Sequence, residues 1–247
     1  YETPNINKLA QEGMKFTDAY AACPVCSPTR ASILTGKYPA TLGLTDWIPG
    51  YEQENARLKT PAFKQQLPLE EITLAEMLKK SGYATASIGK WHLGKQPFYP
   101  ALQGFDINIG GNHWGSPASY FYPYENKRFE TPRKGGEPGE YLTDRLTDEA
   151  LTWIEHHKAE PFFLYLSHYA VHTPLQAKEQ LTEYYRNKAN PETLQNNPVY
   201  AAMIHSADQS VGRILKKLEK LDINDRTVVF LMSDNGGLLQ KSWGDRA

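Results

Sequence analysis

The chain has 247 residues, enough for one large α/β domain with a sizeable core. Its 27 basic and 28 acidic residues give a net charge of −1, and no basic stripe stands out, so the composition argues against a nucleic-acid partner. The apolar runs are too short to span a bilayer, and two cysteines are too few for a disulfide framework.

The first part of the chain predicts two helices separated by a strand. Apolar residues at helical spacing, behind a Thr-Pro start, predict a helix over 4–13. Alternation over 14–20 predicts a strand. A second helix is expected over 27–36, with Ser27 as its N-cap and Pro28 at its first position.

The middle of the chain alternates long loops with short regular elements. Residues 38–69 carry many Pro, Gly and charged residues and predict a long excursion over the surface. A capping-box pattern predicts a helix over 73–80, and a strand follows over 83–88. Residues 96–141 are rich in Gly, Pro and aromatics and predict a second long loop region, of a kind that is often functional.

The last part predicts two helices, each followed by a buried strand. The helices are expected over 143–157 and 200–221, and the strands over 162–166 and 227–232. Helices that alternate with short continuous apolar strands indicate a doubly wound, largely parallel sheet with helices on both faces. Ligands bind such sheets beyond the carboxyl ends of the strands.

Cys26 has the most informative surroundings in the chain. It lies at the predicted positive end of a helix dipole, with the fixed cation of Arg30 one turn further on. This environment suits an anionic substrate or a reactive sulfur. Cys23 and Cys26 also form a C-x-x-C pair, which leaves open a redox pair or, with His168 and His172, a zinc site.

Polar clusters follow three of the predicted strands. Lys90 and His92 are two residues apart, so in extended backbone both side chains point to one side. His172 lies in the loop after the strand over 162–166. Asp234 and Asn235 begin an Asp-Asn-Gly-Gly string whose default interpretation is a turn.

Four strings, in the right order, resemble the formylglycine-dependent sulfatases (arylsulfatase family) of the alkaline phosphatase superfamily. They are C-S-P-T-R-A-S-I-L-T-G at 26–36, the Gly-Tyr to Gly-Lys-Trp-His string at 82–92, the histidine loop at 167–174, and Asp-Asn-Gly-Gly at 234–237. The resemblance implies an alkaline phosphatase-like fold, with 1–247 forming a single sulfatase-like catalytic domain.

The resemblance also implies the chemistry. A formylglycine-generating or maturase enzyme would oxidise Cys26 to formylglycine, an aldehyde whose hydrate is the family's nucleophile. Arg30 would orient residue 26, while Lys90 would help to neutralise the sulfate. His92 would act as a base, and His172 would protonate the leaving alcohol.

The resemblance further implies the ligands and the compartment. Asp234 and Asn235 match the pair that binds one calcium ion in the family, and carboxylate and amide oxygens suit that ion. His113 is expected to touch sulfate or a sugar hydroxyl. Aromatic, Asn and His residues in the loops favour a sulfated carbohydrate as the substrate, and the family suggests a periplasmic or secreted protein.

The sequence departs from the family in ways that indicate a fragment. The first strand with its metal-binding Asp pair, the downstream sulfate-binding lysine and the small C-terminal domain have no match, nor is a signal segment present. Two further functions stay open. One is a phosphonate or phosphate ester hydrolase of the same superfamily, and the other is a non-catalytic sulfatase-like binding protein.

Overall fold

The sheet has three parallel strands in the order β2-β1-β3. The computed structural model describes residues 1–51, 55–124, 136–188 and 196–237, so parts of the predicted loops over 38–69 and 96–141 lie outside the described residues. The strands are β1 (Ala84–Gly89), β2 (Ile107–Ile109) and β3 (Phe162–Ser167). The predicted strands over 83–88 and 162–166 are thus confirmed, whereas β2 lies in a region expected to be loop.

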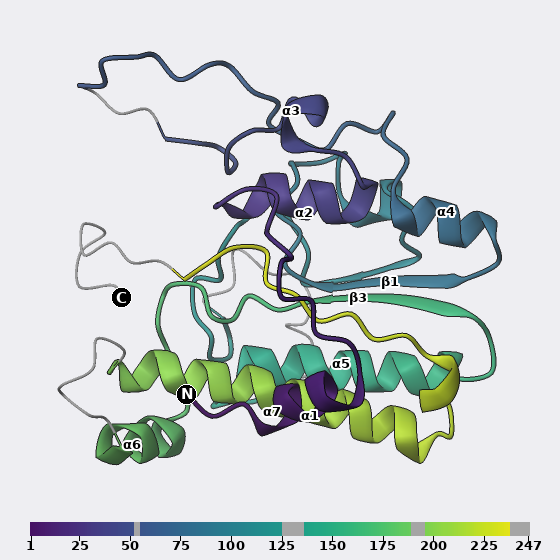
Figure 1. Cartoon of the computed structure of the whole chain (residues 1–247), viewed down its shortest axis with the longest axis vertical. Coiled ribbons are helices and arrows are strands. Elements are labelled where there is room, and N and C mark those ends of the chain that lie inside the picture. Colours follow the sequence, from purple (N-terminus) through teal and green to yellow (C-terminus); the bar gives the residue numbers. More distant parts are fainter. Residues whose placement is uncertain (52–54, 125–135, 189–195, 238–247) are drawn as a thin grey trace.

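Helices cover both faces of the sheet, as expected of a doubly wound fold (Figure 1). On one side lie α2 (Cys26–Thr35) and α4 (Leu74–Lys80). On the other lie α5 (Leu142–His157) and α7 (Pro198–Lys220), with α1 (Pro4–Glu12) packed against α7. The shorter helices are α3 (Pro39–Leu42), α6 (Glu179–Lys188), η1 (Pro100–Leu102) and η2 (Asn224–Arg226). No helix within these described ranges combines the length and apolar character needed to cross a bilayer.

Two large apolar clusters cover the sheet, one on each face. Successive side chains of β3 divide between them, because strand side chains alternate in direction. Phe162 and Leu164 pack into the cluster that contains Leu146 of α5, whereas Phe163 packs into the cluster that contains Leu34 of α2. The all-parallel sheet is therefore buried on both faces, and its strand ends are held at a fixed position.

Two of the predicted strands are wrong. Residues 14–20 contain a turn, and residues 227–232 are irregular; neither segment pairs with another strand in the described part of the chain. Large apolar side chains of both segments are exposed instead, with Phe16 70% and Phe230 78% accessible. A strand needs a neighbour for its backbone hydrogen bonds, and periodicity alone does not supply one.

The helix ends show where local patterns suffice and where they do not. The capping box of α4 is confirmed, because the Thr73 hydroxyl accepts from the Glu76 amide and the Glu76 carboxylate accepts from the Thr73 amide. Thr3 occupies the N-cap position of α1 without a side-chain cap bond. Buried Asp208 of α7 caps that helix instead, accepting from the amides of Asn5 at 3.2 Å and Ile6 at 2.8 Å.

Candidate active site

Cys26 is the first residue of α2, with Val25 in the N-cap position. The expectation that Ser27 caps the helix is wrong, because the Ser27 hydroxyl makes tertiary contacts instead. It donates to the carbonyl of His92 at 3.0 Å and accepts from the amide of Ile48 at 3.2 Å. Gly36 ends the helix in the left-handed conformation, as predicted. The sulfur therefore lies at the positive end of the helix dipole.

The His92 ring lies directly against Cys26. Its Nε2 is 2.6 Å from the carbonyl oxygen of Ile48, and because a carbonyl only accepts, Nε2 carries the proton. In the neutral ring, Nδ1 then has a free electron pair. This atom is 3.3 Å from the Cys26 sulfur. The contact with Ile48 thus selects the tautomer whose basic nitrogen faces residue 26.

Burial and neighbouring cations keep this imidazole neutral. Burial, followed by the charge of Lys90, lowers the pKa of His92 to about 3, and the hydrogen bond to Ile48 opposes the shift only partly. Lys90 itself is 3% exposed. Burial also lowers the pKa of the Lys90 ammonium, while neighbouring Cys26 and Asp234 act in the opposite direction. A neutral imidazole and a buried lysine whose charge is opposed by burial and supported by its neighbours thus both lie near residue 26.

Arg30 fastens the segment that follows β1. Its Nε donates to the carbonyl of Trp91 at 2.9 Å, and its Nη2 donates to the carbonyl of Lys90 and to the Ser167 hydroxyl. Because the side chain is only 4% exposed, these bonds fix a buried guanidinium. Arg30 therefore orients the backbone that carries Lys90 and His92.

The ends of β1 and β3 approach closely beneath this cluster. Gly89 has φ +105°, and a Cβ there would lie 2.0 Å from the carbonyl oxygen of Ser167. The next amide, that of Lys90, donates to the same oxygen at 2.6 Å. Only glycine allows this approach, which brings the two strand ends together at the site.

His172 lies at the solvent-exposed rim of the cluster. Its Nδ1 is 2.9 Å from the carbonyl oxygen of Thr173, so Nδ1 carries the proton and Nε2 is the free nitrogen of the neutral ring. Desolvation by the surrounding protein and the charge of Lys90 lower the pKa of His172, while Asp234 opposes them. Both effects favour the neutral imidazole of His172 in the free protein.

Asp234 and Asn235 lie next to this cluster but do not complete a metal site. The Asp234 carboxylate is 3.4 Å from Nη1 of Arg30, and the Asn235 amide nitrogen donates to the carbonyl of Gly236. Their free oxygens suit calcium, which takes about six to eight oxygen ligands. Among the residues described, no group of three or more His, Cys, Asp or Glu side chains could hold an ion. The two residues therefore supply suitable donors but too few of them.

His113 lies in a turn attached to His92. The amide of His92 donates to the carbonyl of Asn112 at 2.9 Å. The His113 ring is stacked on Tyr99, and its Nδ1 is 2.7 Å from the Tyr99 hydroxyl. Burial, with a smaller effect of Lys95, lowers the pKa of His113. The structure thus places His113 beside the site, one residue from a direct contact with His92.

Gly115, which the sequence patterns did not single out, packs against the face of the His92 ring. A Cβ at Gly115 would lie 2.4 Å from Cε1, 2.6 Å from Nδ1 and 2.8 Å from Nε2 of His92. All three distances are shorter than real contacts, and the backbone of Gly115 has no positive φ that would itself require glycine. Its small size therefore leaves room for the imidazole.

We expect Gly115→Ala to lower kcat by about 10²-fold, because the added methyl displaces Nδ1 from residue 26 by a large fraction of an ångström. Steady-state kinetics on an aryl sulfate and a thermal melt would measure the effect. Gly13→Ala, at the end of α1 and outside the Cys26 cluster, is the control, since a Cβ there meets only the carbonyl oxygen of Leu9, at 3.0 Å. Wild-type kcat in Gly115→Ala would contradict this packing argument.

Cys23 does not share the surroundings of Cys26. Both cysteines are free, and the backbone of Cys23 is held by the Thr29 hydroxyl, which accepts from its amide and lies 2.9 Å from its carbonyl oxygen. The Nε2 of His168 contacts Ser210 on α7 at 2.8 Å, in the layer beyond the sheet. These contacts favour a structural role for Cys23 and His168 over the zinc arrangement.

Cys23→Ala tests the redox alternative. We expect activity equal to that of the wild-type protein, because Thr29 holds Cys23 through its backbone amide and carbonyl, which the substitution leaves in place. The assay is aryl sulfate hydrolysis with and without dithiothreitol. Equal loss of activity in Cys23→Ala and Cys26→Ala would support a redox pair instead.

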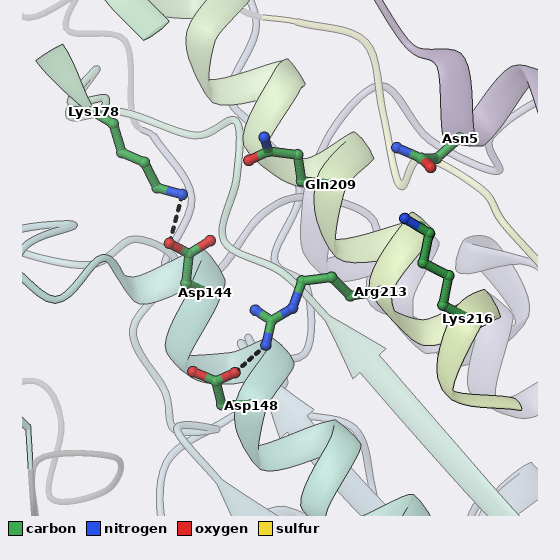
Figure 2. A pocket seen from close by; sticks show the side chains of 8 residues that line it. Asn5, Asp144, Asp148, Lys178, Gln209, Arg213 and Lys216 are labelled. Atoms are coloured by element: carbon green, nitrogen blue, oxygen red, sulfur yellow. Dashed lines mark hydrogen bonds and ion pairs between the residues drawn. The ribbon is translucent and has the colours of Figure 1, made fainter. Parts of the chain in front are cut away.

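A separate cavity of about 520 Å³ lies between α5 and α7 (Figure 2). Its acidic residues are paired, Asp144 with Lys178 at 2.5 Å and Asp148 with Arg213. The cavity is lined by Asn5, Asp144, Asp148, Lys178, Gln209, Gly212, Arg213 and Lys216, none of which belongs to the cluster around Cys26. The paired charges link α5 to α7 and to the residue that precedes α6, and they leave no carboxylate free for catalysis in this cavity.

The fold and the site define an alkaline phosphatase-like α/β protein with a polar centre beyond the carboxyl ends of β1 and β3. The Sulfatase family model matches residues 1–245. Mouse N-acetylgalactosamine-6-sulfatase is 37% identical over 96% of this chain and 46% of its own length. The chain belongs to the sulfatase family, and it spans about half the length of the curated relatives it matches.

Solved structures agree on the fold. Ps i-CgsB in complex with k-i-k-neocarrahexaose superposes with a TM-score of 0.68 at 32% identity, over 90% of this chain and 50% of that chain. The phosphonate monoester hydrolase of Agrobacterium radiobacter, at 17% identity, gives a TM-score of 0.57 over 91% of this chain and 56% of that chain. Since the latter shares only the fold, the architecture alone does not separate sulfatases from phosphonate hydrolases.

Proposed function

We propose that the protein containing this chain hydrolyses sulfate esters of carbohydrates through a formylglycine made from Cys26. The observation that carries the proposal is the contact of Nδ1 of His92 with the Cys26 sulfur at 3.3 Å, at the start of α2 and beside buried Lys90, in a chain of the sulfatase family. A relative named N-acetylgalactosamine-6-sulfatase and a structure bound to a carrageenan hexaose support a sulfated glycan as the substrate class.

The anionic sulfate would be held by positive charge. Lys90, which interacts with residue 26, and the N-terminus of α2 would neutralise charge on the sulfate oxygens. Arg30 would act mainly by holding the Lys90 and Trp91 backbone. The formylglycine would supply the nucleophilic oxygen.

Two histidines would move the protons. Nδ1 of His92 faces residue 26 and is unprotonated, so it would accept a proton there. His172 at the rim would protonate the leaving alcohol. Its pKa is lowered in the free protein, and the negative charge of a bound sulfate ester would act in the opposite direction. His113 would contact a sugar hydroxyl or the sulfate.

Membership of the sulfatase family also supports proposals about the domain, the modifying enzyme, the compartment and the metal ion. We propose that residues 1–247 belong to one catalytic domain, that a formylglycine-generating enzyme modifies Cys26, and that the protein works in the periplasm or outside the cell. Asp234 and Asn235 would contribute two oxygen ligands to a calcium ion, although the described residues contain no group of three or more His, Cys, Asp or Glu side chains that could hold an ion. No proton transfer proposed here depends on that ion.

Hydrolysis of one aryl group, presented both as its sulfate ester and as its phosphonate monoester, tests the proposal. The protein should be produced with a formylglycine-generating enzyme and assayed on both compounds. Faster hydrolysis of the sulfate supports a sulfatase, and faster hydrolysis of the phosphonate supports the other hydrolase class. A modified protein that turns over neither would be a binding protein.

A further inference from the structure

Trp114 is a large aromatic side chain that remains exposed beside the candidate catalytic centre. It is 40% accessible. Its ring lies 4.9 Å from that of His113, which in turn stacks on Tyr99 at 6.3 Å with an interplanar angle of 11°. We call these three rings the aromatic platform. The stacked order holds the indole in place without burying it.

The aromatic platform is attached to His92 by the residues on either side of it in the chain. The carbonyl of Asn112 accepts from the amide of His92, and the backbone of Gly115 lies against the His92 ring. Trp114 lies between these two contacts, and its amide donates to the Asn112 side chain at 2.8 Å. Since consecutive Cα atoms are about 3.8 Å apart, the Cα of Trp114 lies within about 8 Å of the imidazole.

We propose that the aromatic platform binds the pyranose ring that carries the sulfate, and that Trp114 is a specificity-determining residue of the site. An exposed indole on the turn that contacts His92 offers an apolar face to the C–H face of a sugar, while the polar edge of His113 remains near its hydroxyls. A sulfate without a ring would not use this surface. The proposal rests on the proposed function, since it takes residue 26 as the place where sulfate binds.

Binding by the Cys26→Ala variant, which does not consume the ligand, tests the proposal. The probes are galactose 6-sulfate, a sulfated pyranose, and methyl sulfate, which lacks the ring. Adding Trp114→Ala should weaken binding of galactose 6-sulfate by about tenfold and leave methyl sulfate unchanged, as measured by calorimetry. Trp114→Phe, which retains an aromatic face, should recover most of the lost affinity.

Two results would overturn the assignment. Unchanged affinity for galactose 6-sulfate in Trp114→Ala would show that the indole does not contact the sugar. Equal weakening of both probes would show that Trp114 only supports the turn around His92. Failure of the proposed function is a separate result, namely a wild-type protein that carries the aldehyde at residue 26 and hydrolyses no sulfate ester.

Discussion

Cys26→Ala is expected to reduce sulfate ester hydrolysis to the background rate. The variant removes the side chain that starts α2 and lies 3.3 Å from Nδ1 of His92. The neighbouring Ser27 hydroxyl donates to the carbonyl of His92, so it does not replace the lost nucleophile. Hydrolysis of an aryl sulfate by purified wild-type and variant protein measures the effect. The fold should persist, because a small, half-buried sulfur is exchanged for a methyl group.

The matched control is Cys23→Ala, which removes the neighbouring thiol and leaves the site intact. Circular dichroism and thermal melts of both variants separate a lost nucleophile from a lost fold. A Cys26→Ala protein with full sulfatase activity would contradict the mechanism, because residue 26 would then not take part in the reaction.

His92→Gln is expected to lower kcat by roughly 10²–10⁴-fold, the usual contribution of a general acid–base residue. Glutamine can still donate toward the carbonyl of Ile48, but it offers no basic nitrogen to residue 26. Stopped-flow measurement of an aryl sulfate should show one rapid release of aryl alcohol per site, followed by slow turnover. This pattern is expected because His92 serves the later proton transfer and His172 the earlier one.

The pH dependence gives a second readout. Because the pKa of His92 is lowered to about 3, the base stays neutral as the pH falls from 7 toward 4, so the acid side of the wild-type profile does not follow its titration in the free protein. His168→Gln is the matched control, since that histidine contacts Ser210 rather than residue 26. Wild-type kcat in His92→Gln would remove His92 from the proposed proton transfers.

The fold could be predicted from sequence where short-range signals and burial agree. The capping box of α4 and the continuous apolar run of β3 need no information from elsewhere in the chain. The segments over 14–20 and 227–232 fail for the opposite reason. The alternation over 14–20 and the continuous apolar run over 227–232 each satisfy a strand pattern, but pairing depends on a neighbour that a local pattern does not reveal.

The candidate site was predictable in its residue types but not in its supporting contacts. Motif spacing singled out Cys26 and His92, which the structure brings within 3.3 Å. Ser27 has the residue type of a helix cap. Only the folded chain shows that its hydroxyl instead bonds to the carbonyl of His92 and the amide of Ile48. Gly115 lies in a Gly-rich turn, and its approach to the imidazole depends on packing between segments distant in sequence.

Mass spectrometry of the peptide that contains Cys26, from protein made in its own host, tests the central claim most directly. The account predicts that residue 26 carries the mass of an aldehyde in place of a thiol. An unmodified thiol at that position, in protein from the native host, would contradict the formylglycine mechanism. It would favour a redox pair or a non-catalytic binding protein instead.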